Sequence, residues 1–260
     1  MSKKIVAIGG GENGRFLEDG SQTLYETEFI DKRVVKLTKK KNPNFLFLAH
    51  AMSFSNEIQN SYYETMTKIY RDKFGCNCKH LTANDLYNKD LVRELIDWAD
   101  IIYEGGGDTE IMIKLWKETG FDVILEEAWN MGKVICGISA GAVCWFNSCN
   151  SDCGQMNFNV VNCLNWLNLF ITPHCDERGR YKSTIEQLKS SKMVGLMLSS
   201  CSAIEIIDDK YKIIVGTSNG RNFDKGYALK AYWKNDEYYE VKLKESIKYR
   251  LLDELFDTKK

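Results

Sequence analysis

Residues 134–142 read Val-Ile-Cys-Gly-Ile-Ser-Ala-Gly-Ala, an apolar run that ends in the pattern Gly-x-Ser-x-Gly. Small and apolar residues continue as far as Phe146. This order predicts a buried strand that turns sharply into a helix, with Ser139 at the corner. A serine held clear of the sheet on a strained turn needs neighbours without bulky side chains, which explains the glycines. The pattern favours a nucleophilic serine, and the alternative is a tight glycine turn in an ordinary αβ unit.

Composition and charge favour a globular protein of the cytoplasm. The chain has 260 residues, enough for one large α/β domain or two small ones. Its formal net charge of −1 gives no electrostatic footprint for nucleic acid or an anionic membrane, and neither is expected as a partner. No apolar run approaches the roughly 18 residues that span a bilayer, and the N-terminal run is too short for a signal peptide. Nine cysteines, several in apolar runs, fit buried free thiols better than a disulfide framework.

Apolar strands alternate with helical patterns through the first part of the chain. The predicted strands cover residues 5–8, 45–49, 78–82, 101–103 and the run from 134, and the helical patterns cover 24–40, 57–74, 85–98 and 109–131. This alternation predicts a parallel sheet that is covered by helices on both faces.

The last third of the chain changes character. Closely spaced short strands are predicted at 193–198, 203–207, 212–215, 231–233 and 238–241. They suggest an antiparallel edge or hairpin extension on the same sheet, followed by a helix over 246–256. The chain is thus predicted to be a single domain over residues 1–260. A parallel core would occupy about 1–200, and the β extension and terminal helix about 201–260.

Ligands of such a sheet gather at the carboxyl ends of the strands. The turns expected there are Gly9-Gly10-Gly11-Glu12, His50-Ala51-Met52-Ser53, the Gly-Gly-Gly-Asp-Thr segment at 105–109, and the Ser139 corner. Free N–H groups of the glycine segment, together with that of Ala140, would form a pair of donors for an oxyanion. The alternative is a flexible turn whose helix is capped by Asp108.

A serine nucleophile needs a base, and the chain has only three histidines. His174 follows an apolar run that should end a strand at this edge of the sheet. His50 also follows a strand and is the second choice. His80 lies within a short strand and has no evident convergent partner.

Two other patterns suggest different chemistry. Residues 9–14 fit the dinucleotide pattern Gly-x-Gly-x-x-Gly, but residues 15–23 do not open a clear helix and no acid follows the second strand. Cys76, Cys78 and His80 alternate and would project from one face of a strand, but no second pair of metal ligands is evident. Neither pattern predicts a cofactor or a metal.

The order of the blocks resembles the dipeptidase E and cyanophycinase family of serine peptidases. The matching blocks are Gly-Gly-Gly-Asp-Thr at 105–109, Gly-Ile-Ser-Ala-Gly-Ala at 137–142, the downstream Pro173-His174 step and the opening Ile-Gly-Gly-Gly-Glu. The resemblance implies a flavodoxin-like three-layer α/β sandwich with a mostly parallel central sheet, related to class I glutamine amidotransferases. It also implies Ser139 as nucleophile, His174 as base, and the N–H groups of Gly107 and Ala140 as the oxyanion hole.

The resemblance leaves the third member of a catalytic triad open. The family usually carries a carboxylate just before the strand at 203–206, where it orients the histidine, but residues 198–202 read Leu-Ser-Ser-Cys-Ser. The candidates for the orienting group are Glu205, Asp152 and the hydroxyl of Ser200.

The expected activity is hydrolysis of a short peptide, with an N-terminal aspartyl residue or a β-aspartyl link, through an acyl-enzyme. Asp108, Arg178 and Arg180 are the candidate substrate-binding residues, since an arginine can pair bidentately with the substrate carboxylate. The expected partner is the small peptide, with the protein acting as a monomer or homodimer. The competing hypothesis is a binding protein that kept the fold and lost catalytic power with the triad acid.

Overall fold

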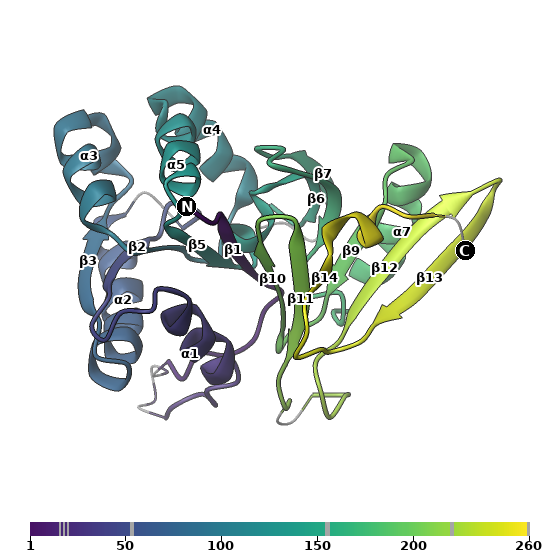
Figure 1. Ribbon diagram of the computed structural model, residues 1–260, viewed down its shortest axis with the longest axis horizontal. Helices are drawn as coiled ribbons and strands as arrows, with labels where there is room; N and C mark the ends of the chain where they lie inside the picture. Colours follow the sequence, from purple (N-terminus) through teal and green to yellow (C-terminus); the bar gives the residue numbers. More distant parts are fainter. Residues whose placement is uncertain are drawn as a thin grey trace.

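Two β-sheets form the framework of the protein, as the computed structural model shows (Figure 1). The structure describes residues 1–15, 17, 19, 21–52, 55–153, 157–218 and 221–258. Within these residues the first sheet has eight strands in the order β14-β11-β10-β1-β5-β4-β2-β3. Its strands are β1 (Lys4–Ile8), β2 (Asn44–Leu48), β3 (Asn77–Leu81), β4 (Ile101–Glu104), β5 (Val134–Ile138), β10 (Ser202–Ile207), β11 (Lys210–Val215) and β14 (Arg250–Leu251).

The first sheet combines a parallel core with an antiparallel edge. The pairs β1–β5, β5–β4, β4–β2 and β2–β3 are all parallel, as the alternation of strands and helices predicted. Strand β10 joins β1 antiparallel, and β11 joins β10 antiparallel. This part of the predicted extension therefore lies on the same sheet.

Helices cover both faces of the parallel core (Figure 1). One face carries α1 (Glu28–Leu37) and α2 (Asn56–Thr67), which continues into a π-helical turn at Lys68–Lys73. The other face carries α3 (Lys89–Trp98), α4 (Thr109–Thr119) and α5 (Phe121–Asn130). Alternate residues of β1 reach opposite layers. Val6 belongs to the apolar core that includes residues of α1 and α2, whereas Ile5 belongs to the core that includes residues of α3, α4 and α5. The predicted three-layer α/β sandwich is confirmed.

A second sheet departs from the prediction of one extended sheet. It runs in the order β13-β12-β9-β8-β6-β7 through the described residues. Its strands are β6 (Phe146–Ser151), β7 (Asn159–Asn162), β8 (Leu167–Thr172), β9 (Gly195–Leu198), β12 (Ala228–Lys234) and β13 (Glu237–Leu243), with α7 (Arg180–Ser191) packed against it. Between the two sheets lies α6 (Ala140–Val143), which has only four residues. The chain then enters a new sheet at β6, and β8, β9 and the β12–β13 hairpin add to it in turn.

The predicted terminal helix over 246–256 is wrong. The structure has the short strand β14 there, followed by a 3₁₀ turn at Leu252–Leu255. The strand forms because Arg250 and Leu251 pair with β11, and that pairing overrides the local helical pattern. The predicted helical region 109–131 consists of two helices, divided at Gly120, whose φ of 72° ends α4.

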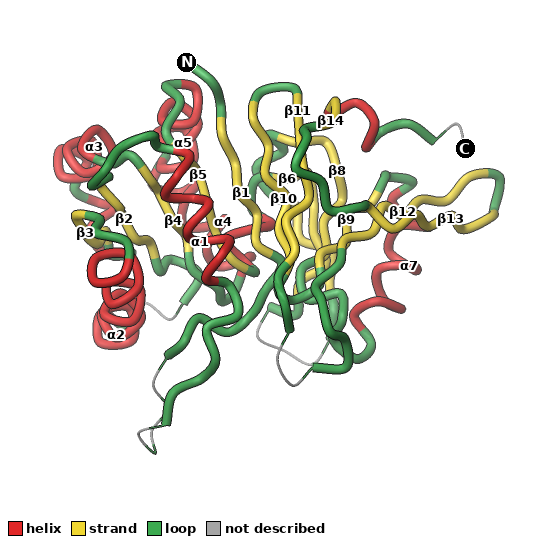
Figure 2. The backbone as a smooth tube through the Cα atoms, turned by 60° about the horizontal axis from the view of Figure 1, so that its bottom comes forward, coloured by secondary structure: helices red, strands yellow, loops and turns green. Residues whose placement is uncertain are grey.

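The loops that follow several strands gather at one end of the molecule, away from the N-terminus (Figure 2). The loop after β1, the loop after β4 and the turn after β5 meet there, since Ser139 N donates to Ile8 O at 3.0 Å and Gly141 N donates to Gly105 O at 3.1 Å. The loop after β8 joins them through His174 N, which donates to Gly9 O at 2.9 Å. Ser53, at the end of the predicted 50–53 turn, lies outside the described residues.

Candidate active site

Ser139 occupies the corner between β5 and α6. Its φ of 55° and ψ of −114° belong to a region that residues with side chains rarely adopt. The two glycines around it have no space for a side chain. A Cβ on Gly137 would lie 2.2 Å from Gly141 O, and one on Gly141 would lie 2.2 Å from Glu104 O. The strained turn at Ser139 and the need for small neighbours, both predicted from the sequence, are confirmed.

His174 lies beside Ser139, although 35 residues separate the two in the sequence. The Nε2 atom of the imidazole is 3.0 Å from Ser139 Oγ, within the range expected for a serine and its base. His174 has a φ of 46°, so the backbone turns sharply where β8 ends. The structure thus brings together the serine and the histidine that the sequence favoured.

His50 has a structural role instead. Its side chain is fully buried, Nε2 lies 2.9 Å from Leu81 O, and Trp116 Nε1 donates to Nδ1 at 2.9 Å. An indole nitrogen can only donate, so Nδ1 accepts and the imidazole is neutral. Burial lowers the pKa of His50 to about 3, which keeps it uncharged. The third histidine, His80, stacks on Tyr63 with ring centroids 5.0 Å apart.

The imidazole of His174 is mostly buried. Its side chain is 22% exposed. Burial lowers the pKa of His174 below its ordinary value, and the nearby Glu177 carboxylate acts in the opposite direction. The net effect favours the neutral imidazole, which is the form that can accept a proton from Ser139.

The structure corrects two of the three candidates for the orienting group. The Asp152 carboxylate binds Arg180, with Oδ2 2.8 Å from Nη2. The Glu205 carboxylate accepts two hydrogen bonds from the Arg33 guanidinium, at 2.6 and 2.8 Å. Glu205 lies mid-strand in β10, and alternation directs its side chain to the α1 face, away from the strand ends where the site forms.

Ser200 is the candidate that does reach the imidazole. Its Oγ lies 3.4 Å from His174 Nδ1, on the side away from Ser139. Sequence reasoning missed a second neighbour, Glu177, whose Oε1 lies 3.7 Å from the same nitrogen. The signal was present as the acidic pair Asp176-Glu177 directly after the histidine block. Their distance from the imidazole depends on how the loop turns, which the pattern does not specify.

The candidate oxyanion donors lie next to the corner. Among the described residues, no hydrogen-bond partner is found for the N–H of Gly107 or of Ala140. Gly107 has a φ of 146°, and a Cβ there would lie 2.0 Å from Ala51 O. Its neighbour Gly106 approaches the serine, since a Cβ on Gly106 would lie 3.5 Å from Ser139 Cβ. Two free donors therefore border the loop that faces Ser139.

The candidate substrate-binding residues are largely engaged within the protein. Asp108 caps α4, because its Oδ1 accepts from the N–H groups of Glu110 and Ile111 at 2.8 and 3.1 Å. Arg180 is only 4% exposed and is paired with two carboxylates. Arg178 is exposed on the loop before α7.

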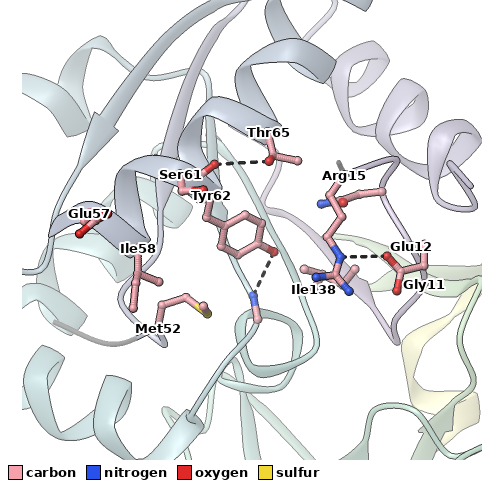
Figure 3. A pocket seen from close by; sticks show the side chains of 12 residues that line it. Gly11, Glu12, Arg15, Met52, Glu57, Ile58, Ser61, Tyr62, Thr65 and Ile138 are labelled. Carbon is pink, nitrogen blue, oxygen red and sulfur yellow. Dashed lines mark hydrogen bonds and ion pairs between the residues drawn. The ribbon is translucent and has the colours of Figure 1, made fainter. Parts of the chain in front are cut away.

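A cavity of about 600 Å³ opens beside the corner (Figure 3). Its wall combines apolar, hydroxyl and charged side chains, and the lining residues are Gly11, Glu12, Asn13, Arg15, Met52, Glu57, Ile58, Ser61, Tyr62, Thr65, Gly106 and Ile138. Gly106 and Ile138 connect the cavity to Ser139. Arg15, which sequence reasoning did not single out, pairs here with Glu12 at 3.2 Å.

The glycine pattern at 9–14 is not followed by a dinucleotide-binding helix. Gly14 N donates to Leu24 O at 3.1 Å and Thr23 N donates to Arg15 O at 2.9 Å, so the described residues form an extended excursion. In the described part of the chain, no group of three or more histidine, cysteine or acidic side chains is arranged to hold a metal. None of the described helices is long and apolar enough to cross a bilayer.

Comparison with known proteins identifies the family. Residues 16–214 match the model of peptidase family S51. The chain belongs to peptidase family S51. This S51 chain is 33% identical over 221 residues to the uncharacterized peptidase YgaJ of Bacillus subtilis (strain 168), and the match covers 84% of this chain and 89% of that protein. It is a serine-type peptidase of the dipeptidase E type, and the family that the motifs predicted is confirmed.

Two solved structures share the S51 fold. A peptidase from an acI-B1 Actinobacterium superposes with a TM-score of 0.65 at 16% identity, covering 96% of this chain and 97% of that one. A putative peptidase E protein from Listeria monocytogenes EGD-e has a TM-score of 0.59 at 18% identity, covering 82% of this chain and 98% of that one. At these identities the likeness shows the fold, and it agrees with the sandwich seen here.

Proposed function

We propose that this S51 peptidase hydrolyses short peptides through an acyl-enzyme on Ser139. Ser139 Oγ attacks the scissile carbonyl while His174 Nε2 takes the hydroxyl proton. The imidazolium then returns that proton to the leaving amine, and a water deprotonated by the same nitrogen releases the acid product. The observation that carries the proposal is the 3.0 Å contact between the two atoms, with Ser139 held at positive φ.

The remaining parts of the mechanism come from the backbone. The N–H groups of Gly107 and Ala140 are the proposed donors to the tetrahedral oxyanion, because neither has a partner among the described residues. Loss of one such donor costs about 10²–10³ in kcat in a well-studied serine protease. Gly107 packs closely on Ala51 O, and Gly141, the residue after Ala140, packs closely on Glu104 O, so little rearrangement of the backbone is needed when charge develops.

The proposed substrate has an N-terminal aspartyl residue or a β-aspartyl link, as in the family that the motifs resemble. The carboxylate of this substrate would pair with Arg15, on the wall of the cavity beside Ser139. Arg15 suits that role better than Arg180, which is buried against carboxylates of the protein itself. A planar guanidinium can pair with a carboxylate through two parallel hydrogen bonds.

A second candidate is a family member that binds peptides and turns them over slowly. It is favoured by Ser200, whose hydroxyl can accept a hydrogen bond from His174 Nδ1–H but carries no charge. A neutral acceptor stabilises the imidazolium less well than a carboxylate does.

The proposed nucleophile is tested with a serine-directed phosphonate followed by mass spectrometry of the digested protein. We expect one adduct, on the peptide that contains Ser139, and we expect Ser139→Ala to remove it. His174→Ala should slow adduct formation by at least tenfold. The control Ser190→Ala, at an exposed serine of α7, should leave the rate of adduct formation unchanged. An adduct that persists in Ser139→Ala would overturn the assignment.

The substrate class is tested with a panel of dipeptides that includes aspartyl and β-aspartyl members. Arg15→Gln should raise KM for aspartyl substrates by about tenfold and change KM for neutral substrates far less, since only the former lose an ion pair. An equal change for both groups would contradict the role given to Arg15.

A further inference from the structure

The loop after His174 folds back on the imidazole. Glu177 N donates to His174 O at 2.9 Å, which closes a tight turn over four residues. The turn brings the Glu177 side chain to the Nδ1 face of the ring, where Oε1 lies 3.7 Å from Nδ1. A carboxylate therefore stands on the side of the imidazole opposite Ser139.

The other oxygen of Glu177 is held in place by a buried arginine. Arg180 Nε donates to Glu177 Oε2 at 2.9 Å, and Arg180 Nη2 donates to Asp152 Oδ2 at 2.8 Å. The arginine is 4% exposed, and its Nη1 also donates to Asn150 O at 3.4 Å. With Oε2 fixed on the arginine, Oε1 is left facing the histidine.

The other charged groups around His174 are engaged differently. Asp176 Oδ1 accepts from Ser200 N at 2.6 Å, and its Oδ2 lies 3.7 Å from an Arg221 nitrogen. Arg180 and Arg221 both act on the imidazole as cations, and Asp176 and Glu177 act on it as anions. Among these carboxylates, Glu177 is the one in ion-pair distance of Nδ1.

We propose that Glu177 is the positioning carboxylate of His174, and that it replaces the acid which this chain lacks before β10. The inference rests on the proposed roles of Ser139 and His174. When the serine proton moves to Nε2, the ring becomes an imidazolium whose Nδ1–H faces Glu177 and Ser200. The anion stabilises that charge, and the 3.7 Å contact between Oε1 and Nδ1 tightens as the charge forms. Glu177 is 45% exposed, so solvent screens the interaction and its effect is smaller than that of a buried triad acid.

The inference is tested first without any substrate. Because the chain has three histidines, the imidazole protons can be followed individually by NMR titration, with His174→Ala assigning the signal. Glu177→Gln should lower the proton affinity of His174 by about threefold to tenfold, since a negative charge is removed. The matched control is Glu186→Gln, an exposed carboxylate further along α7, which should leave it unchanged. Equal shifts in the two variants would overturn the inference.

The second measurement is the pH dependence of kcat/KM. Glu177→Gln should move the acidic limb to lower pH and reduce kcat by about 10-fold to 100-fold with little change in KM, well below the ~10⁴ of the best-studied triad acid. Glu177→Asp keeps the negative charge on a side chain that is one methylene shorter. Because its carboxylate lies farther from Nδ1, this variant should also lose most of the contribution of Glu177 to kcat. A drop in kcat without a shifted limb would indicate a merely structural role and contradict the inference.

The two proposals fail separately. If the phosphonate does not label Ser139, the hydrolase mechanism is rejected, and the NMR titration still decides whether Glu177 acts on His174. If Ser139 is labelled and Glu177→Gln behaves as Glu186→Gln, only the positioning role is rejected.

Discussion

The α-carbon of Gly10 lies against the imidazole of His174. A Cβ atom on Gly10 would come within 2.2 Å of Cε1 and 2.3 Å of Nδ1. Gly10 also has a φ of 153°, and its carbonyl accepts from Cys201 N at 2.9 Å. The loop after β1 therefore packs against the proposed catalytic base. This contact explains why the pattern at 9–14, which resembles a nucleotide-binding loop, has a glycine at position 10.

Gly10→Ala should reduce hydrolysis by about 100-fold, because the new methyl group displaces the imidazole from Ser139 and even a 1 Å misplacement is costly. Circular dichroism should show a folded protein. Gly120→Ala is the matched control, since Gly120 also has positive φ but a Cβ there meets nothing within 4 Å. The control should lose about 1–2 kcal/mol of stability, because alanine is strained in the left-handed region, and keep its activity. Full activity in Gly10→Ala would contradict this view of the loop.

Glu104 should make stability fall as pH rises above neutrality. The carboxyl is fully buried, its Oε1 accepts from Ala51 N at 3.1 Å, and Oε2 has no hydrogen-bond partner among the described residues. His50 Nδ1, 3.7 Å away, accepts from Trp116 and has no proton to offer. Burial raises the pKa of Glu104 to about 8, so the carboxyl is uncharged in the folded state at neutral pH.

The sign of the effect follows from proton binding. The folded state holds a proton on Glu104 up to about pH 8, whereas the unfolded state releases it near its ordinary value of 4.5. The stabilisation is therefore complete below pH 4.5 and is lost as pH rises to 8. Burial also raises the pKa of Asp31 to about 6, so Asp31 adds to this loss of stability as pH rises through a lower range. Burial lowers the pKa of His50, so His50 has the opposite effect and makes stability rise with pH up to 6.5.

Between pH 6.5 and 8 the Glu104 contribution should dominate, and the free energy of unfolding should drop by about 1–2 kcal/mol. Glu104→Gln resembles the protonated carboxyl and should flatten this slope in urea unfolding. Glu110→Gln, an exposed carboxylate on α4, should leave it as in the wild type. An unchanged slope in Glu104→Gln would show that the carboxyl is charged in the folded state.

Glu205 should affect stability and not catalysis. Burial opposes its ionisation, but hydrogen bonds from Arg33 and Tyr249 outweigh burial and lower the pKa of the carboxyl. Glu205→Gln should destabilise the protein by about 2–4 kcal/mol, because Arg33 and Lys212 lose their buried partner. Phosphonate labelling of Ser139 at a temperature where the variant is folded should proceed at the wild-type rate. Slower labelling there would restore Glu205 as a candidate orienting acid.

Asp108 should behave as a helix cap. Asp108→Ala should lower stability by about 1 kcal/mol through loss of the two N-terminal hydrogen bonds of α4, and Asp108→Ser should recover most of it. KM for aspartyl dipeptides should be the same in both variants and the wild type. A rise in KM shared by Ala and Ser would indicate that the carboxylate contacts substrate.

Local patterns were sufficient for the parallel core and for the corner. A continuous apolar run followed by Gly-x-Ser-x-Gly specifies a buried strand and a strained turn within a few residues, so the position of Ser139 could be predicted from 134–142 alone. His174 was predictable because an apolar run places it at a strand end, and the resemblance to a family supported the choice over His50.

Contacts between distant segments decided the rest. The partner of a strand depends on which edges are free once the chain has folded, so the second sheet and the replacement of the terminal helix by β14 left no local signature. The same holds for the environment of the base. Gly10 comes from the loop after β1, Glu177 from the reverse turn after β8, and Ser200 from the turn between β9 and β10. They meet around one imidazole only because the ends of these strands, which belong to two different sheets, converge there. Sequence periodicity records which face of an element is buried, but not which distant side chains the fold brings to that face.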